Sequence, residues 1–380
     1  MEKVIGVNLG NWLVLERWMK PKLFEGTGAI DETWLCRNLS KEEYHDKVKA
    51  HRDTYVTEED FAFLASIGVS YIRIPVPYFI FGDRDPFPGC IEYLDQAFEW
   101  AKEHNQHILI DLHTAPHGQN GYDNGGITGV CKWAQHPEEV EFVLSVLQRL
   151  AARYKDHPSL YGIEVLNEPI SWLVFITAKS TRQAVDKQEA KGSKHVSMKF
   201  LKQFYHDAYY RLREVLPKDK VIVFHDGFRL TKWNQFFRKE KFENVLLDTH
   251  IYIFAMEFFN PISRPWIYRL FLKASMVQVK KAQKDIPVIV GEWCISTRYC
   301  YKAKGKDEQA TKAIQKKRYQ EVAAMEMEAF SQADGWFYWN YQLLHDREEA
   351  CDTIWKEPWD FYRCVCHGYI TAEDIEKAKK

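Results

Sequence analysis

The chain has 380 residues, of which 46% are hydrophobic and 28% are charged, a mixture typical of folded globular proteins. Lysine and arginine together number 52 against 53 aspartate and glutamate residues, so the formal net charge is -1. This composition excludes a disordered chain, and the charge balance gives no electrostatic reason to expect binding to nucleic acid or to an anionic membrane.

The N-terminus, MEKVIGVNLGNWLVLERW, lacks a basic start followed by a long apolar run, so we expect no signal peptide. No stretch of about 18 uncharged apolar residues is present, so we expect no membrane span. The eight cysteines are scattered along the chain without the spacing of a disulfide framework. These features predict a cytoplasmic protein whose thiols are mostly reduced.

Eight short apolar runs recur along the chain, and most of them are rich in β-branched or aromatic residues. Their nearly continuous hydrophobicity is typical of parallel strands that are buried on both faces. In chain order, the predicted strands span residues 4–9, 71–76, 107–113, 160–168, 220–227, 245–252, 287–294 and 335–342.

Amphipathic segments lie between several of these runs, for example at residues 58–68, 93–105 and 138–157. Their apolar residues recur at three- and four-residue spacing, which predicts helices. Eight strand–helix repeats predict the α/β class and a closed (β/α)8 TIM barrel with extended βα loops. A doubly wound sheet is the alternative, but the glycine-rich phosphate loops that often accompany it, GxGxxG and GxxxxGK[ST], are absent.

A minimal barrel takes about 250 residues, so we expect a single catalytic domain over residues 1–380 with insertions near 10–57, 169–200 and 253–286. All three insertions follow the C-terminal ends of predicted strands, where such barrels carry their active sites. The lysine-rich piece at 178–195 is expected to be a solvated, flexible loop. The tail at 343–380, which ends in a helix, is expected to pack outside the barrel.

Polar side chains stand at the C-terminal ends of the predicted strands, where a buried strand should be apolar. Two of them are glutamates, on the fourth and seventh strands, and opposed carboxyl groups across a pocket suit the cleavage of glycosidic bonds. One carboxyl would protonate the leaving oxygen, while the other would attack the anomeric carbon or activate water. If the barrel closes, one ring contains Arg73, His113, Asn167, Glu168, Asp226, His250, Tyr252, Glu292 and Trp339.

Five short motifs resemble glycoside hydrolase family 5, in the clan of retaining (β/α)8 glycosidases. They are VLNEP (165–169), VGEW (290–293), RIP (73–75), DLH (111–113) and HIY (250–252). Longer stretches at 10–26, 57–76 and 111–126 resemble the exo-β-1,3-glucanase group of that family. The resemblance covers roughly residues 4–340 and is weaker at 173–200, at 254–286 and after 342.

The resemblance implies that Glu168 is the general acid/base and Glu292 the nucleophile. Retention of configuration needs the two carboxyl groups only about 5–5.5 Å apart. We expect Arg73 to keep Glu292 ionised, and we expect the charge of Glu292 to raise the pKa of Glu168 so that Glu168 starts protonated.

Substrate-binding roles are implied at further positions of the ring. Asn167 would hydrogen-bond the sugar 2-hydroxyl, and Tyr252 would orient the nucleophile. His113 and His250 would bind sugar or support the catalytic residues. Trp339 would stack against the apolar face of the glucose ring.

Exo-action requires a pocket that closes beyond the first sugar. The resemblance implies that Glu16, Asp123 and Asn124 close it, because buried polar groups that grip hydroxyls reject a continuing chain. A plain glycine-rich turn is the alternative for the YDNGG segment (122–126), which carries two of these residues.

The leaving-group side of the pocket is less well defined by the sequence. Tyr122 would line its entrance, and Phe254 or Phe258 would form the opposite side. The resemblance fails in that second region and again after Trp339, where the segment NYQLL matches no familiar motif.

We therefore expect a retaining β-glycoside hydrolase, an exo-β-1,3-glucanase or β-glucosidase that releases glucose from β-glucan oligosaccharides or β-glucosides by double displacement. No metal or cofactor is required, because the two carboxyl groups supply both acid and nucleophile. The alternatives are an endo-β-glucanase, a β-glycosidase for small glucosides, a transglycosylase and a catalytically silent carbohydrate-binding protein. No nucleic-acid or membrane partner is expected, and the sequence does not indicate an oligomeric state.

Overall fold

Eight parallel strands form a closed barrel in which each strand pairs with its neighbours in sequence and β8 returns to β1. The computed structural model describes residues 3–344, 351 and 353–380. All eight predicted strands are present, which confirms the (β/α)8 prediction. They are β1 Val4–Asn8, β2 Tyr71–Val76, β3 His107–Leu112, β4 Leu160–Glu164, β5 Val221–His225, β6 Val245–His250, β7 Val288–Trp293 and β8 Gly335–Tyr338.

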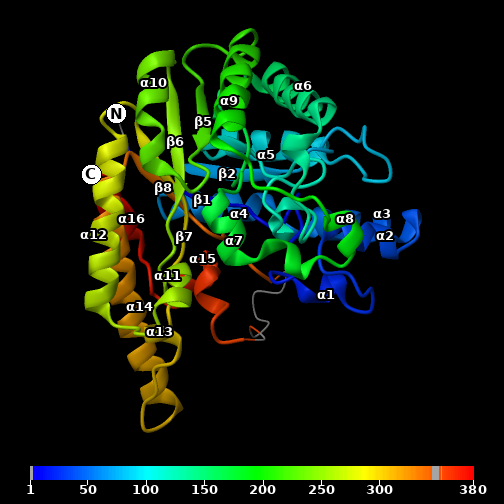
Figure 1. The fold of residues 1–380 in the computed structure, drawn as a ribbon. Helices are drawn as coiled ribbons and strands as arrows, with labels where there is room; N and C mark the ends of the chain where they lie inside the picture. Colours follow the sequence, from blue (N-terminus) through cyan, green and yellow to red (C-terminus); the bar gives the residue numbers. More distant parts are fainter. Residues whose placement is uncertain (1–2, 345–350, 352) are drawn as a thin grey trace.

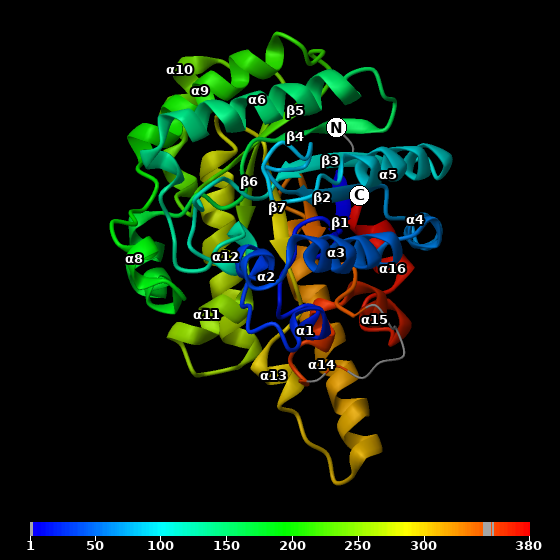
Figure 2. The same cartoon turned by 90° about the vertical axis from the view of Figure 1, so that its right-hand side faces the viewer.

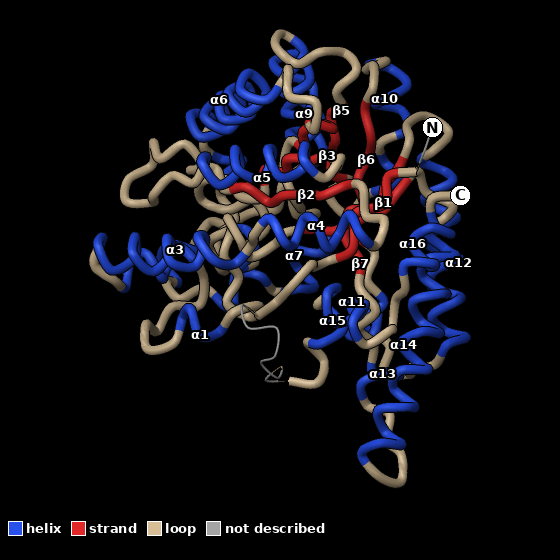
Figure 3. The backbone as a smooth tube through the Cα atoms, turned by 180° about the vertical axis from the view of Figure 1, so that it is seen from behind, coloured by secondary structure: helices blue, strands red, loops and turns tan. Residues whose placement is uncertain are grey.

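Helices surround the strands on the outside (Figures 1 and 3). The helices predicted at 58–68, 93–105 and 138–157 correspond to α4, α5 and α6. The described helices are α1 Pro21–Phe24, α2 Glu32–Asn38, α3 Lys41–Tyr55, α4 Glu58–Ser66, α5 Ile91–Glu103, α6 Pro137–Tyr154, α7 Trp172–Ala178, α8 Lys187–Ala190, α9 Met198–Arg213, α10 Asn234–Glu240, α11 Ile253–Phe259, α12 Pro265–Ala282, α13 Arg298–Tyr301, α14 Glu308–Phe330, α15 Phe361–Cys366 and α16 Ala372–Ala378. Short 3-10 turns are η1 Asp123–Gly125, η2 Trp133–Gln135, η3 Ser180–Gln183, η4 Leu230–Lys232 and η5 Glu357–Trp359.

Several helices begin at residues whose side chains satisfy the free backbone N–H groups of the first turn. Ser40 and Glu43 form a reciprocal capping box at the start of α3, and Thr57 and Asp60 do the same at α4. Pro137 occupies the first turn of α6, where a missing N–H costs nothing. These local signals explain why the helices start where the sequence periodicity places them.

The interior of the barrel is apolar in its N-terminal half. Side chains that point inward alternate along each strand, and those nearest the strand beginnings are Val4, Leu109, Val221, Val223, Leu246, Ile289 and Phe337, which form one buried cluster. This floor fills the barrel, so a ligand can enter only from the C-terminal ends of the strands.

The lysine-rich segment 178–195 is not the plain flexible loop that we expected. It contains η3 and α8, and Glu189 forms an ion pair with Arg37 of α2 at 2.7 Å. Ala184 and Ala190 pack with Ile127 and Val130 of the loop that follows β3. The insertion after β4 therefore supports the 121–130 loop, although many of its lysines do face solvent as predicted.

The segments that follow β1 and β8 meet at the C-terminal end of the barrel (Figure 2). The ring of Trp18 stacks on Trp355 at 6.0 Å and meets Trp359 edge-on at 5.3 Å. The tail ends in α16, whose Glu376 lies beside Gly68 at the end of α4, outside the barrel as predicted. Residues 345–350 and 352 of the predicted tail lie outside the described residues. Among the described residues, no helix is both long and apolar enough to cross a bilayer.

Candidate active site

The C-terminal half of the barrel interior is charged, and Arg73 of β2 lies at its centre. Its guanidinium is fully buried and reaches side chains from four other strands or strand ends. Its nitrogens lie 2.7–3.1 Å from oxygens of Asn8, Asp111, Glu164, Asn167 and Glu292. A planar, permanently charged fork with five donors suits this position, because each partner is held in a fixed direction.

Glu292, in β7, is held from three directions. Its Oε1 accepts a hydrogen bond from Arg73 at 3.1 Å, and its Oε2 accepts one from the Tyr252 hydroxyl at 2.8 Å. The Nδ1 atom of His250 lies 3.3 Å from the same Oε2. The predicted contacts of Arg73 and Tyr252 with this carboxyl are therefore both present, and they fix its orientation.

Glu168, just after β4, faces the same space. Its Oε1 lies 2.8 Å from Nδ1 of His250, and its Oε2 accepts a hydrogen bond from the Asn124 amide at 3.0 Å. The residue has a φ of 46°, a left-handed conformation that is costly for a side chain larger than glycine. The backbone here turns the carboxyl inward and holds it there despite that cost.

His250 bridges the two glutamates. Its Nδ1 is 2.8 Å from Oε1 of Glu168 and 3.3 Å from Oε2 of Glu292. These two oxygens, one from each carboxyl group, therefore lie at most about 6 Å apart. Retaining glycosidases place the carboxyl groups about 5–5.5 Å apart, whereas inverting enzymes need about 6.5–9.5 Å. The geometry therefore fits the retaining arrangement.

The pKa values of the two glutamates differ from our expectation. Burial would raise the pKa of Glu168, but the hydrogen bond and charge of His250 outweigh it and lower this pKa to about 2. Burial raises the pKa of Glu292, although His250 and Arg73 oppose the rise. The prediction that Glu292 raises the pKa of Glu168 is wrong, because the imidazole between them dominates.

The pKa shifts favour His250 over Glu168 as the holder of the proton that the prediction assigned to Glu168. Burial alone would lower the pKa of this histidine, yet Glu292, Asp248 and Glu168 together raise it well above its ordinary value. These shifts favour an imidazolium next to a carboxylate, with Nδ1 of His250 2.8 Å from Oε1 of Glu168. A proton transfer along that contact would convert Glu168 into an acid, and the two pKa shifts oppose this transfer in the resting site.

His113, Asn167 and Trp339 form one wall of the same space. The ring of His113 stacks on Trp339 at 5.6 Å with an angle of 10° between the planes. Its Nδ1 lies 2.5 Å from Asp111 and its Nε2 lies 3.3 Å from the Asn167 amide. Trp339 is almost completely buried. The three predicted residues are therefore adjacent, and their mutual contacts orient them.

The second predicted carboxyl pair is also brought to the site. Glu16 is buried, and its Oε2 accepts a hydrogen bond from the Trp18 indole at 2.7 Å. Burial and the nearby charge of Asp123 raise the pKa of Glu16 well above its ordinary value. Burial raises the pKa of Asp123 to about 6. Two neighbouring carboxyl groups that resist ionising together suit the binding of sugar hydroxyls as one donor and one acceptor.

The predicted entrance residues lie at the edge of the site. Tyr122 is half-buried, and the charge of Glu168 adds to the effect of burial in raising its pKa. Asn124, which is predicted to help close the pocket, donates a hydrogen bond from its amide to Glu168. Phe254 meets Trp359 edge-on at 5.5 Å and Phe258 at 5.1 Å, and Phe258 is largely exposed.

Three buried carboxyl groups of the site were missed by the sequence reasoning. Asp111 and Glu164 bind Arg73, and Asp248 accepts a hydrogen bond from the backbone N–H of Gly291 at 2.6 Å. A Cβ atom at position 291 would collide with Asp248, so glycine is required there. The signal was available, because a charged residue inside an apolar strand, two positions before His113 or His250, shares the inward face.

Asp226, which we placed in the ring, caps a turn. Its carboxyl accepts hydrogen bonds from the Thr249 hydroxyl and the Phe228 backbone. Ligand atoms of Glu168, His225 and His250 lie within 4.8 Å of one another and could approach a cation. A cation there would have to replace the hydrogen bond between Glu168 and His250, so we assign this group to proton handling.

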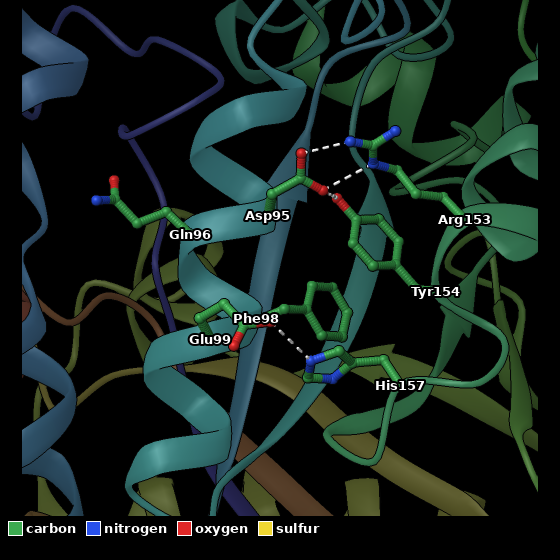
Figure 4. A pocket seen from close by; sticks show the side chains of 7 residues that line it. All are labelled: Asp95, Gln96, Phe98, Glu99, Arg153, Tyr154 and His157. Atoms are coloured by element: carbon green, nitrogen blue, oxygen red, sulfur yellow. Dashed lines mark hydrogen bonds and ion pairs between the residues drawn. The ribbon is translucent and has the colours of Figure 1, made fainter.

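A separate hollow of about 460 Å³ lies outside the barrel between α5 and α6 (Figure 4). Its charged side chains form pairs across the hollow. Arg153 binds both carboxyl oxygens of Asp95 at 2.7 and 2.5 Å, and the Tyr154 hydroxyl donates to the same carboxyl at 2.8 Å. The arrangement fastens α6 to α5.

Comparison with known proteins identifies the family. The sequence model of the family described as cellulase (glycosyl hydrolase family 5) matches residues 38–342. The chain belongs to glycoside hydrolase family 5. It is therefore a glycoside hydrolase, and the resemblance seen in its motifs is confirmed.

Curated relatives match over most of the chain. A probable glucan 1,3-beta-glucosidase A of Emericella nidulans is 37% identical over 77% of this chain and 67% of its own length. A glucan 1,3-beta-glucosidase of Blumeria graminis is 31% identical over 90% of this chain and 82% of its own length. Among solved structures, rutinosidase from Aspergillus niger superposes with a TM-score of 0.74 at 22% identity, covering 97% of this chain and 98% of that one. That likeness shows that the two chains share a fold.

Proposed function

We propose that this family 5 enzyme is a retaining exo-β-1,3-glucosidase that releases glucose from β-glucan oligosaccharides or β-glucosides. The observation that carries the proposal is the pairing of Glu168 with Glu292 through His250, next to the second carboxyl pair of Glu16 and Asp123. Relatives named glucan 1,3-beta-glucosidase support the same substrate class.

In the first step, Glu292 attacks the anomeric carbon and forms a covalent glycosyl-enzyme. Arg73 and Tyr252 hold its two oxygens. The carboxylate is therefore already oriented for attack and does not have to change its side-chain rotamer first. Glu168 takes the proton from Nδ1 of His250 and passes it to the departing oxygen. Asn167 is placed to bind the sugar 2-hydroxyl, a contact that strengthens at the transition state.

In the second step, Glu168 acts as the base. Once the leaving group has gone, its carboxylate removes a proton from the incoming water, which attacks the anomeric carbon and frees Glu292. The proton that Glu168 removes from water returns to Nδ1 of His250 along the contact that supplied the first proton, so both groups regain their starting states. One glutamate thus performs both proton transfers, as the double-displacement mechanism requires.

The pair of Glu16 and Asp123 accounts for exo-action. A protonated Glu16 donates to a hydroxyl of the terminal glucose, and an ionised Asp123 accepts from another. A chain that continued past this point would leave both groups buried without partners, which costs about 1–3 kcal/mol for each group. The site therefore favours a chain end over an internal unit.

Product analysis over time tests the proposal. The protein is incubated with laminari-oligosaccharides and with cello-oligosaccharides, beside a Glu292→Gln control. Glucose released one unit at a time from the β-1,3 series is the expected result. Internal cuts that give mixed oligomers would indicate an open cleft and an endo-glucanase. If folded protein releases no product from either series, small β-glucosides are the next substrates to test.

Glu16→Gln provides a sharper test of the closed pocket. Because it changes one hydrogen bond to substrate, we expect kcat/KM on laminari-oligosaccharides to fall about tenfold or more, with an unchanged melting temperature. Glu25→Gln, at an exposed position nearby, is the matched control and should have no effect. A lower melting temperature with unchanged kinetics would show that Glu16 is structural.

The cytoplasmic location stays a prediction.

A further inference from the structure

We propose that the outer face of α12, together with the end of α11, binds the surface of a lipid bilayer that carries anionic phospholipids. This inference goes beyond the proposed hydrolase activity and does not depend on it. In Figure 1, α12 lies on the outer flank of the barrel with α11 beside its lower end. One stripe along the helix is exposed at three- and four-residue spacing, and it consists of Trp266, Leu270, Lys273, Val277, Lys280 and, just past the helix end, Lys284.

The charge of this region is one-sided. From residue 258 to residue 284 the sequence contains no aspartate or glutamate, whereas it contains Arg264, Arg269, Lys273, Lys280, Lys281 and Lys284. Among the described residues, Arg269 is the member of this set with an ion-pair partner, Glu321 at 3.4 Å. The formal net charge of -1 hides this local excess, because acidic residues elsewhere balance it. The patch is complementary to an anionic lipid surface.

The apolar side chains between these cations are unusually exposed. Phe258 and Phe259 are 69% and 78% exposed, and Trp266 and Leu270 are each 59% exposed. A helix that presents Trp, Phe and Leu with interspersed Lys and Arg is typical of peptides that lie in the interface of a bilayer. Single exposed apolar residues need no explanation, but several of them on one helix face, together with lysines at the same spacing, do.

A groove beside the stripe has the same character. It has a volume of about 400 Å³ and lies between α12 and α14. Buried Leu272, Met276 and Met325 line it. Lys273 and Lys280 contribute to its α12 side, and Glu328 of α14 is an acidic group on the opposite side. The apolar floor with two lysines on one side provides further contact for a lipid headgroup and the first part of its chain.

The proposed surface is continuous with the mouth of the active site. Helix α11 begins directly after Tyr252, which donates to Glu292. Phe254 lies between Trp359 and Phe258, with ring centroids 5.5 and 5.1 Å away. An unbroken series of aromatic rings therefore leads from the catalytic carboxyl to the exposed end of α11, so docking would place the mouth at the edge of the bilayer.

Vesicle co-sedimentation of the full chain tests the proposal without any glycoside. Vesicles of phosphatidylcholine alone are compared with an equal mixture of phosphatidylcholine and phosphatidylglycerol. We expect the protein to sediment with the mixed vesicles, to bind the neutral ones less, and to be released by high salt, because screening weakens the attraction. Absence of binding to the mixed vesicles, or equal binding to both kinds, would overturn the proposal.

Two sets of variants locate the surface. Lys273→Glu with Lys280→Glu should lower partitioning to the mixed vesicles by at least about tenfold, since each cation near an anionic surface contributes about fivefold. Lys102→Glu with Lys199→Glu makes the same change of charge on α5 and α9 and should have a much smaller effect. Phe258→Ser with Phe259→Ser should also reduce binding, whereas Tyr210→Ser, at an exposed position of α9, should not. Equal losses in test and control variants with unchanged melting temperatures would contradict the assignment.

Discussion

The two halves of the barrel interior are built from opposite kinds of side chain. The N-terminal half is an apolar cluster that includes Leu109, Val223 and Phe337. The C-terminal half, only one or two inward positions further along the same strands, is organised around Arg73 and its carboxylate partners. The difference shows how one scaffold separates stability from chemistry: the floor excludes water, while the charged half holds its groups in fixed directions.

The charged half is tolerated because its members satisfy one another. A buried carboxylate without a partner is costly, whereas one that accepts hydrogen bonds from a buried guanidinium is not. Removing a member of the charged half should therefore affect catalysis first, and removing a member of the floor should affect stability first. Three variants test that distinction, and a fourth tests the cost of a buried carboxyl group that lies outside the barrel interior and has no hydrogen-bond partner among the described residues.

Glu292→Ala should have the largest effect. The variant loses the nucleophile, so no glycosyl-enzyme forms and hydrolysis of β-glucosides is abolished. The measurement is the steady-state rate on an aryl β-glucoside, with circular dichroism as a check that the barrel is intact. Turnover near that of the unaltered enzyme would remove Glu292 from the role of nucleophile.

Glu168→Ala should reduce turnover of natural glucosides by about 10²–10⁴-fold, the usual contribution of a general acid. The glycosylation step should suffer much less with a dinitrophenyl leaving group, which departs without protonation. Pre-steady-state rates with both kinds of leaving group separate the cases. The same loss for both groups in the glycosylation step would argue against the acid role.

Leu109→Ala tests the floor. The side chain is fully buried in the apolar cluster, so we expect the free energy of unfolding to fall by about 2–5 kcal/mol. Denaturant unfolding measures this, and kcat of the folded variant should stay close to that of the unaltered enzyme. Val277→Ala, at an exposed position, is the matched control. A large loss of kcat with unchanged stability would mean that the floor takes part in catalysis.

Glu326→Met should have the smallest of the four effects and the opposite sign. Glu326 of α14 is fully buried, and neither carboxyl oxygen has a hydrogen-bond partner among the described residues. Replacing an unpartnered buried carboxyl with an apolar side chain should raise the free energy of unfolding by about 1–3 kcal/mol at neutral pH. Glu328→Met, at an exposed position of the same helix, controls for the added apolar surface.

The gain from Glu326→Met should also depend on pH. Burial raises the pKa of Glu326 well above its ordinary value, so the folded state binds the proton more tightly than the unfolded state. The unaltered protein therefore loses stability as pH rises from the ordinary glutamate range, near about 4.3, towards the raised pKa. The difference between variant and parent should grow over that window, and a difference independent of pH would contradict the assignment.

The sequence predicted the scaffold well because the signals were local. Eight apolar runs at regular spacing define the strands, and motifs such as VLNEP and VGEW place Glu168 and Glu292 at strand ends. It could not predict that His250 would lie between them, because that depends on how β4, β6 and β7 meet across the barrel. The lowered pKa of Glu168 follows mainly from this contact, and His225 and Asn124 add to the effect.

Two further features were not predicted from the sequence. One depends on packing between distant residues, and the other was hidden because charge was summed over the whole chain. The segment 178–195 is lysine-rich and polar, yet Ala184 and Ala190 dock on Ile127 and Val130, residues far away in sequence. The positive charges of α12 are balanced by acidic residues elsewhere and so do not show in the net charge of the chain. Their helical spacing with Trp266 and Leu270 was nevertheless present in the sequence. A local count of charges along each predicted helix would have found them.

Covalent trapping tests the central claim most directly. The enzyme is incubated with an activated 2-deoxy-2-fluoro-β-glucoside, whose fluorine slows both steps while the good leaving group still allows the first. Mass spectrometry of the intact protein and of its proteolytic peptides then locates any adduct. The account predicts one added fluoroglucosyl group on Glu292, with Glu292→Gln unlabelled and turnover lost in step with labelling. An adduct on another residue, or rapid inactivation without any adduct, would contradict it.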